Sequence, residues 1–349
     1  MKFLTLRFFN NKLKLFSIFK IENKLSIIVI LVIFSTLLEL IGIGLLIPIA
    51  SLIFESDNII SNKLINILPT SLETKNSLHL FLIMFLLTFL IKNTILIFVE
   101  YYKANYFHKV FLSITNKFYY FYLNARLNFY FKKNSSKIIH IILSRIPEYI
   151  GSLQAFANLV SEIILTFGIV VLLLSVSSLY TIVVIFFLVC FVSVYLKFLK
   201  KKLILYGQMR DENQSNYVKH MNETLSFFRE LNIFDLKKHF QVLENQISKK
   251  FVNAQKNITF LNSIGRNIFE IIAIICIFSF LIILNKKEIS ITNALPIIGI
   301  YMAGAIKILP SINRISNGIQ NITVNFNVTE TIIDEIISLE KNQLKLIEK

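Results

Sequence analysis

The chain has 349 residues, of which 55% are hydrophobic, and it carries a formal net charge of +16. A soluble globular protein contains roughly 45–50% apolar residues, which seldom form long uninterrupted runs. Five apolar runs with almost no charge exclude a soluble enzyme and a disordered chain. Their length also excludes an outer-membrane barrel, whose strands cross in about 9–11 residues. The five runs are residues 26–54, 78–99, 158–199, 267–284 and 294–312.

The N-terminal region, 1–24, is amphipathic and basic, and it lacks the apolar core and cleavage site of a signal peptide. We predict that it forms an interfacial (elbow) helix on the inner leaflet. A first membrane span is expected at about 26–54, where Gly42, Gly44 and Pro48 permit close packing and a bend.

A second span is expected at about 78–102, and its helix should continue well beyond the membrane. No Gly or Pro occurs between Leu78 and Leu127. About fifty helical residues reach about 75 Å, whereas the hydrocarbon core is about 30 Å thick. The excess length predicts a first cytoplasmic stalk at about 103–150.

The apolar run at 158–199 is too long for one span, since about 20 residues suffice to cross. Its middle, residues 175–178, reads Ser-Val-Ser-Ser, which is typical of a turn. We therefore expect two spans here and six in the chain. The last four expected spans are about 155–175, 179–199, 267–284 and 294–318.

Residues 200–266 are predicted to form a second cytoplasmic stalk, because they contain few Gly and no Pro. From Leu225 onward, apolar residues recur mostly every three or four positions, which predicts an amphipathic helix. The predicted stripe comprises Phe228, Leu231, Phe234, Phe240, Leu243, Ile247 and Phe251. The predicted fold is an all-α membrane protein with six transmembrane helices and long cytoplasmic extensions, over 25–339, followed by a charged tail at 340–349.

The basic residues are concentrated on one side of the predicted spans. Thirty-two of the 37 Lys and Arg residues fall in the segments that lie inside if the N-terminus is inside. This is the positive-inside bias, and it places both termini in the cytoplasm. Topology thus explains the net charge, and no nucleic-acid partner is predicted. The two cysteines and five scattered histidines predict no disulfide framework and no metal site.

Four stretches in this plan resemble the transmembrane domain of an ABC exporter, and most closely the branch that flips lipid-linked oligosaccharides. They cover the chain from about residue 20 to 340. The stretches are Leu37–Pro48; Lys133–Ser136 with Val160–Glu162; Asn222–Leu225 with Arg229–Leu231 and Phe240; and Leu309–Ile315. The resemblance implies a multi-pass protein of the bacterial inner membrane, acting as a homodimer or paired with a related half. It also implies an amphipathic substrate, and the branch implies a lipid-linked oligosaccharide.

The sequence departs from such exporters in one large respect. A phosphate-binding loop needs G-x-x-x-x-G-K-[ST], and none of the nine glycines is followed by Lys. We therefore expect this chain alone to be no enzyme and to bind no cofactor. ATP and Mg would be bound by a separate nucleotide-binding ATPase subunit, unless the sequence is part of a longer chain.

Charges inside a bilayer are costly and often functional, so those in the expected spans are candidates for a polar substrate cavity. A cavity for an anionic headgroup would use basic side chains, Arg being suited to a bidentate grip. The alternative is structural pairing between helices or snorkelling, and for Glu39, Glu162 and Glu270 we expect pairing to prevail. The cavity candidates are Glu39, Lys92, Lys307 and Arg314.

The stalk tips are candidates for contact with the ATPase. By resemblance, Leu127–Phe131 and Met221–Phe228 form short coupling helices, although the family often has Gly-Ile-Lys where this chain has Phe227-Phe228-Arg229. Aromatic side chains suit such docking; the alternative is that they pack within the stalks. The candidate coupling residues are Phe129, Tyr130, Phe131, Glu223, Phe227 and Phe228.

Two other functions are open. An ATP-independent carrier would predict inverted repeats and broken helices at the midplane, and we find no internal repeat. A membrane-embedded lipid-modifying enzyme needs a convergent acid–base or metal cluster, and no such motif stands out. The exporter interpretation is therefore the preferred hypothesis.

Overall fold

The computed structural model describes residues 30–40, 74–125, 135–176, 178–286, 291–328, 331–332 and 334–335. Over these residues the chain is helical apart from short turns, and it contains no strand. This confirms the all-helical class predicted from the apolar runs.

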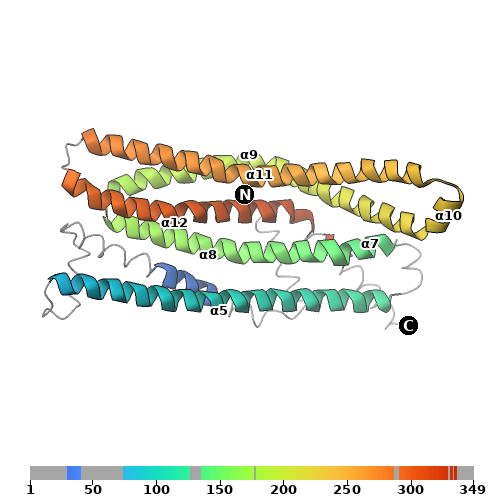
Figure 1. Cartoon of the computed structure of the whole chain (residues 1–349), viewed down its shortest axis with the longest axis horizontal. Helices are drawn as coiled ribbons and strands as arrows, with labels where there is room; N and C mark the ends of the chain where they lie inside the picture. Colours follow the sequence, from blue (N-terminus) through green and yellow to red (C-terminus); the bar gives the residue numbers. More distant parts are fainter. Residues whose placement is uncertain are drawn as a thin grey trace.

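Five long helices make up most of the described chain, and four short helical pieces accompany them (Figure 1). The long helices are α5 (Thr74–Leu123), α8 (Ile146–Val176), α9 (Ser178–Ser226), α11 (Lys237–Lys286) and α12 (Ile291–Val324). The short pieces are the helix Ile30–Leu40, α7 (Ser135–His140), the π-helix η1 (Ile141–Arg145) and α10 (Phe228–Ile233).

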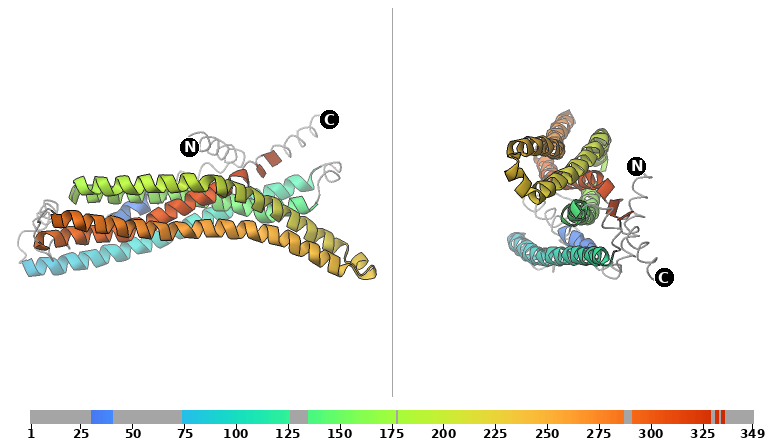
Figure 2. Two further views of the ribbon diagram at one scale, coloured as in Figure 1. Left: turned by 90° about the horizontal axis from the view of Figure 1, so that it is seen from above. Right: turned by 90° about the vertical axis from the view of Figure 1, so that its right-hand side faces the viewer.

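The long helices lie roughly side by side. Helices α9 and α11 form an antiparallel pair, α12 packs against α8 and touches both members of the pair, and α5 lies on the other side of α8. The α9–α11 pair curves away from the other helices and carries α10 at its far end (Figure 2). A helix of 50 residues, such as α5 or α11, spans about 75 Å, more than twice the hydrocarbon thickness.

The far end of this pair differs from the sequence prediction. We expected one apolar stripe from Leu225 to Phe251, but α9 ends at Ser226, α10 is a separate helix, and α11 begins at Lys237. The break after α10 contains Asp235 with a φ of 50°. Aspartate tolerates this left-handed conformation better than most residues, because its short side chain can hydrogen-bond locally. The prediction of one continuous helical stripe was therefore wrong, because apolar spacing alone does not reveal a turn.

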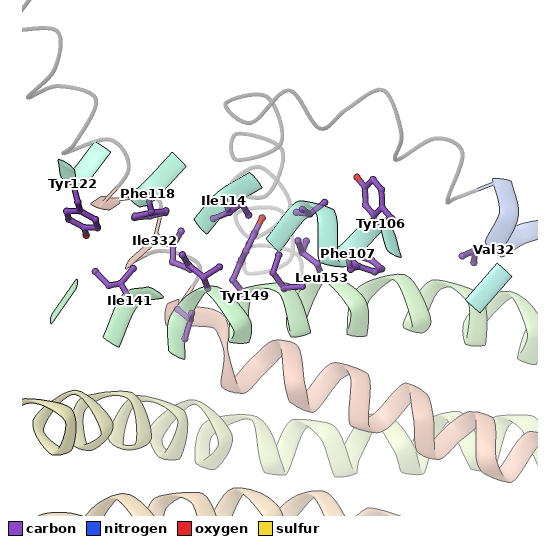
Figure 3. Close-up of a cluster of buried hydrophobic side chains, with 14 residues drawn as sticks. Val32, Tyr106, Phe107, Ile114, Phe118, Tyr122, Ile141, Tyr149, Leu153 and Ile332 are labelled. Atoms are coloured by element: carbon purple, nitrogen blue, oxygen red, sulfur yellow. The ribbon is translucent and has the colours of Figure 1, made fainter. Parts of the chain in front are cut away.

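Three apolar clusters hold the described helices together. One lies between α5, η1, α8 and the segment that follows α12, and it buries Phe118, Ile141, Tyr149 and Ile332 (Figure 3). A second lies among α8, α9, α11 and α12 and buries Phe269 fully. A small third cluster joins Leu203 of α9, Ile258 of α11 and Val324 of α12. The core is thus a series of contacts along the length of the helices.

Two helices of the described chain are long and apolar enough to cross a membrane, Phe85–Leu123 and Ser135–Leu174. Only 11% and 17% of their most apolar stretches are buried in the molecule. A core helix of a soluble protein would be mostly buried, so these outward-facing apolar surfaces favour association with a membrane. The other four expected spans contain side chains outside the described residues.

Candidate functional site

Three of the charges in the expected spans form ion pairs. Arg314 on α12 binds both carboxylate oxygens of Glu162 on α8, with 3.1 Å between Nη2 and Oε2, and it also donates to Ser311. Glu270 lies 3.0 Å from Arg266, one turn earlier on α11. The expected pairing between helices is therefore confirmed for Glu162, whereas Glu270 pairs within its own helix at an exposed position. The charge of Arg314 is already offset by Glu162.

Lys92 lies in a different environment. Its side chain is 5% exposed, and its Nζ lies 4.4 Å from the centre of the Phe89 ring. It interacts electrostatically with two charges on neighbouring segments, Lys307 on α12 and Glu39 in the first helix. No ion pair to Lys92 is present within the described part of the chain. Lys92 is thus a buried ammonium group with one like and one opposite charge nearby, among α5, α12 and the helix Ile30–Leu40.

The tip of the α9–α11 pair presents apolar side chains to the outside. Phe227 is 52% exposed, Phe228 63% and Phe234 68%, whereas Leu231 is buried and anchors α10. The two aromatic coupling candidates here therefore do not pack within the stalk. Glu223 lies 3.8 Å from Lys219 on the last turns of α9. The other coupling candidates, Phe129, Tyr130 and Phe131, lie outside the described residues.

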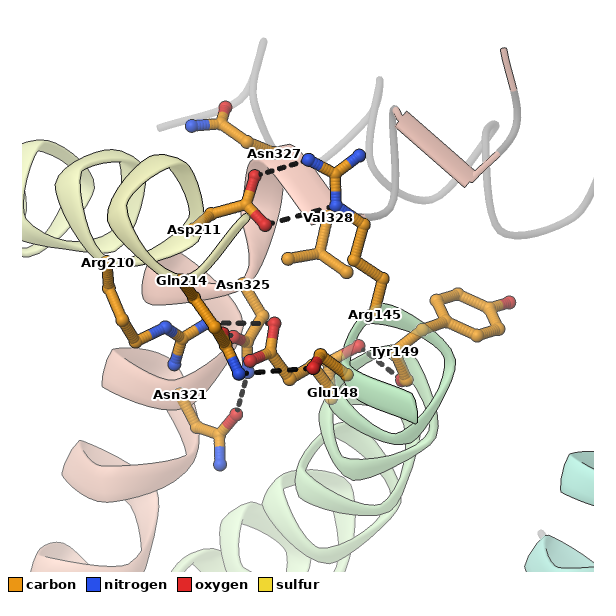
Figure 4. A network of polar contacts seen from close by, with 12 residues as sticks. Arg145, Glu148, Tyr149, Arg210, Asp211, Gln214, Asn321, Asn325, Asn327 and Val328 are labelled. Atoms are coloured by element: carbon orange, nitrogen blue, oxygen red, sulfur yellow. Dashed lines mark hydrogen bonds and ion pairs between the residues drawn. The ribbon is translucent and has the colours of Figure 1, made fainter. Parts of the chain in front are cut away.

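A polar network joins the two stalks at mid-length, where Asp211 on α9 meets two basic side chains. Arg145 donates from Nε and Nη2 at 3.1 and 2.8 Å, and His140 Nε2 lies 3.3 Å away (Figure 4). Burial alone would raise the pKa of Asp211. The hydrogen bond from His140, and the charge and hydrogen bonds of Arg145, outweigh burial and lower that pKa below its usual value.

The neighbouring residue, Arg210, extends this network to two more helices. Its Nη2 lies 2.9 Å from Glu148 on α8 and donates a 2.8 Å hydrogen bond to Asn325, just after α12. One turn further along α9, Gln214 donates to Ser144 of η1. Helix α9 is therefore tied to η1, α8 and the end of α12 by one polar stripe.

The sequence analysis missed this network. Its signal was present, because Arg210 and Asp211 are adjacent, and Arg145 and Glu148 lie three residues apart among apolar neighbours such as Ile146, Tyr149 and Ile150. Charged residues in such positions usually have partners. What the sequence did not show was which partner each one has.

Within the described residues, no group of three or more His, Cys, Asp or Glu side chains is arranged to hold a metal ion. Compared with known proteins, the chain matches no family model and no curated sequence. The resemblance to exporters therefore rests on the four sequence stretches and on the plan of the helices.

Proposed function

We propose that this chain is the transmembrane (permease) subunit of an ABC exporter, with six spans and cytoplasmic termini in a bacterial inner membrane. It moves an amphipathic substrate across that membrane, driven by ATP hydrolysis in a separate nucleotide-binding subunit. The observation that carries the proposal is the long α9–α11 pair, which extends beyond the other helices and ends in the exposed aromatic residues around α10.

The length of these helices supports a driven transporter. Each of α9 and α11 has about 50 residues, which is more than twice what a span requires. A channel or carrier has little use for rigid extensions of this length, whereas a membrane unit moved by a cytoplasmic ATPase needs them to transmit force.

The exposed residues around α10 support the proposal that a protein partner binds at the tip of the α9–α11 pair. Phe227, Phe228, Ile233 and Phe234 lie within eight residues, and each is more than half exposed. Clustered apolar side chains on an exposed short helix are typical of a contact surface, with the aromatic residues as anchors in a groove of the partner. We propose that this groove belongs to the ATPase subunit.

The basic residues of the membrane part support an anionic substrate. Lys307 repels the ammonium group of Lys92 and Glu39 attracts it, so a phosphate group bound here would be attracted by two basic side chains. Arg314 would join them only if it leaves Glu162 during the transport cycle. A lipid-linked oligosaccharide, which carries a pyrophosphate between sugar and lipid, is the substrate that the branch resemblance implies.

Gentle purification of the tagged chain from its native membranes, followed by mass spectrometry, tests the proposal. We expect a stoichiometric ATPase that carries a phosphate-binding loop. Its reproducible absence would contradict the proposal.

Two variants test whether the ATPase subunit binds at the tip of the α9–α11 pair. Phe228→Asp should reduce the recovered ATPase at least about tenfold without lowering the yield of the chain, because a charge at an interface anchor removes apolar contact. Val252→Asp on the exposed middle of α11 serves as the matched control and should retain the partner. Equal recovery with both variants would show that the tip is not the docking site.

A further inference from the structure

Helix α5 has few attachments of its own to the rest of the molecule. Among the described helices it packs mainly on α8, and it lies at the edge of the molecule in Figure 1. Its buried face in the cytoplasmic half consists of Tyr106, Val110, Ile114, Phe118 and Tyr122. What covers these side chains therefore decides whether α5 moves with the other helices or apart from them.

The residues that follow α12 supply much of that cover. Val328 and Ile332 are each 1% exposed, and both belong to the apolar cluster that contains Phe118 and Tyr149. Figure 3 shows Ile332 between the side chains of α5 and those of η1 and α8. Ile332 therefore packs against α5 and against η1 and α8 at the same time, and it ties these helices together.

Polar contacts hold each end of this segment. At its start, Asn325 accepts the 2.8 Å hydrogen bond from Arg210 of α9. Near its end, Glu335, which is 9% exposed, accepts a 3.1 Å hydrogen bond from the hydroxyl of Tyr122 on α5. The segment thus contacts α9 at one end and α5 at the other, two helices with no extensive direct contact.

We infer that the described residues 325–328, 331–332 and 334–335 form a clamp that holds α5 to α8 and α9, and so sets the position of the cytoplasmic end of α5 relative to the α9–α11 pair. Helix α5 moves together with η1, α8 and α9 while the clamp is docked, and it separates from them when the clamp is released. The inference concerns a movement within the chain. It depends neither on the ATPase nor on the substrate of the proposed function.

Distance measurements between spin labels test the clamp in the full chain, after replacement of the cysteines by Cys190→Ser and Cys276→Ser. One label pair spans the boundary, with Tyr119→Cys on α5 and Leu143→Cys on η1. A second pair, Leu205→Cys on α9 and Val252→Cys on α11, reports on the rest of the molecule. All four positions are at least half exposed.

The variant Ile332→Asp places a charge in the apolar cluster and should release the clamp. We expect the distance distribution between Tyr119→Cys and Leu143→Cys to broaden and move to longer distances, while the second pair is unchanged. Asp334→Asn, at an exposed position of the same segment, is the matched control and should leave both distributions unchanged.

Two results would overturn the inference. One is a folded Ile332→Asp protein with an unchanged distance between α5 and η1; the other is an equal change in both label pairs, which means general loss of packing. If Ile332→Asp does not fold, the double variant Ile332→Ala, Tyr122→Phe replaces it. That variant must broaden the first distribution alone, and an unchanged distribution would equally reject the clamp.

Discussion

Arg145 and Asp211, 66 positions apart in the chain, form a bidentate ion pair in which both side chains are 13% exposed. His140 reaches the same carboxylate from five residues before Arg145. In a regular α-helix, residues five apart point about 140° away from each other. The π-helix η1 runs from just after His140 to Arg145, and a π-helix forms its backbone hydrogen bonds between residues five apart. His140 and Arg145 therefore lie on the same side of the helix, and both face α9. The irregular turn is what makes this three-membered contact possible.

Removal of the carboxylate should destabilise the molecule strongly. Asp211→Asn leaves Arg145 as a largely buried charge without its counterion, and breaking such a pair typically costs about 3–5 kcal/mol. We expect a clear fall in the thermal unfolding midpoint in detergent. Lys219→Gln breaks an exposed pair and should cost less than about 1 kcal/mol. Equal midpoints for the two variants would contradict the structural role of Asp211.

The contribution of Asp211 should depend on pH in one direction. Because its pKa is lowered in the folded state, its stabilisation is complete above the unfolded pKa of about 3.9, and it is lost as the pH falls through the lower folded value. The difference in stability between the wild type and Asp211→Asn should therefore not shrink between pH 7 and pH 5, and it should shrink below about pH 4. Chemical denaturation at a series of pH values measures it. If the stability difference between the two proteins already shrinks above pH 5, the lowered pKa of Asp211 is refuted.

Two glycines provide a matched test of helix packing. A Cβ at Gly207 on α9 would lie 2.5 Å from the backbone oxygen of Val324, whereas a Cβ at Gly151 on α8 would meet nothing within 4 Å. Gly207→Ala should thus destabilise by about 1–3 kcal/mol, as overpacking does. Gly151→Ala should stabilise by about 0.5–1 kcal/mol, because alanine is the better helix former. Thermal unfolding compares them, and a Gly207→Ala protein as stable as wild type would disprove the close contact.

Arg314 and Lys92 should respond differently to neutralisation. Arg314→Gln leaves Glu162 unpaired and should lower the unfolding midpoint, and the double variant Glu162→Gln, Arg314→Gln should recover part of the loss. Lys92→Gln removes a buried charge that has no ion-pair partner among the described residues. The thermal unfolding midpoint should therefore stay the same or rise.

Transport provides the second measurement on Lys92. With a fluorescent polyprenyl-pyrophosphate-linked sugar in proteoliposomes that contain the copurified ATPase, Lys92→Gln should slow flipping at least about tenfold, because an opposite charge is lost from a low-dielectric site. Wild-type rates in both Lys92→Gln and Arg314→Gln would reject a cationic substrate cavity.

Local sequence properties determined much of the architecture. Hydropathy and the absence of Gly and Pro predicted a long helix from Leu78 onward, and α5 covers Thr74–Leu123. The polar break at 175–178 marks the place where α8 ends and α9 begins. Both features follow from short-range effects, namely backbone propensity and the cost of placing polar groups in an apolar run.

The tertiary structure alone decided which side chains meet. Whether Arg314 is held by Glu162, or Asp211 by Arg145, depends on how helices distant in sequence are rotated and shifted against one another, and periodicity within one helix does not carry that information. The same reason applies to Ile332, an ordinary apolar residue in the sequence that lies buried between two helices in the fold. The sequence thus determined the helices and their approximate ends, while packing between them decided the ion pairs, the buried polar network and the contact that joins α5 to the rest.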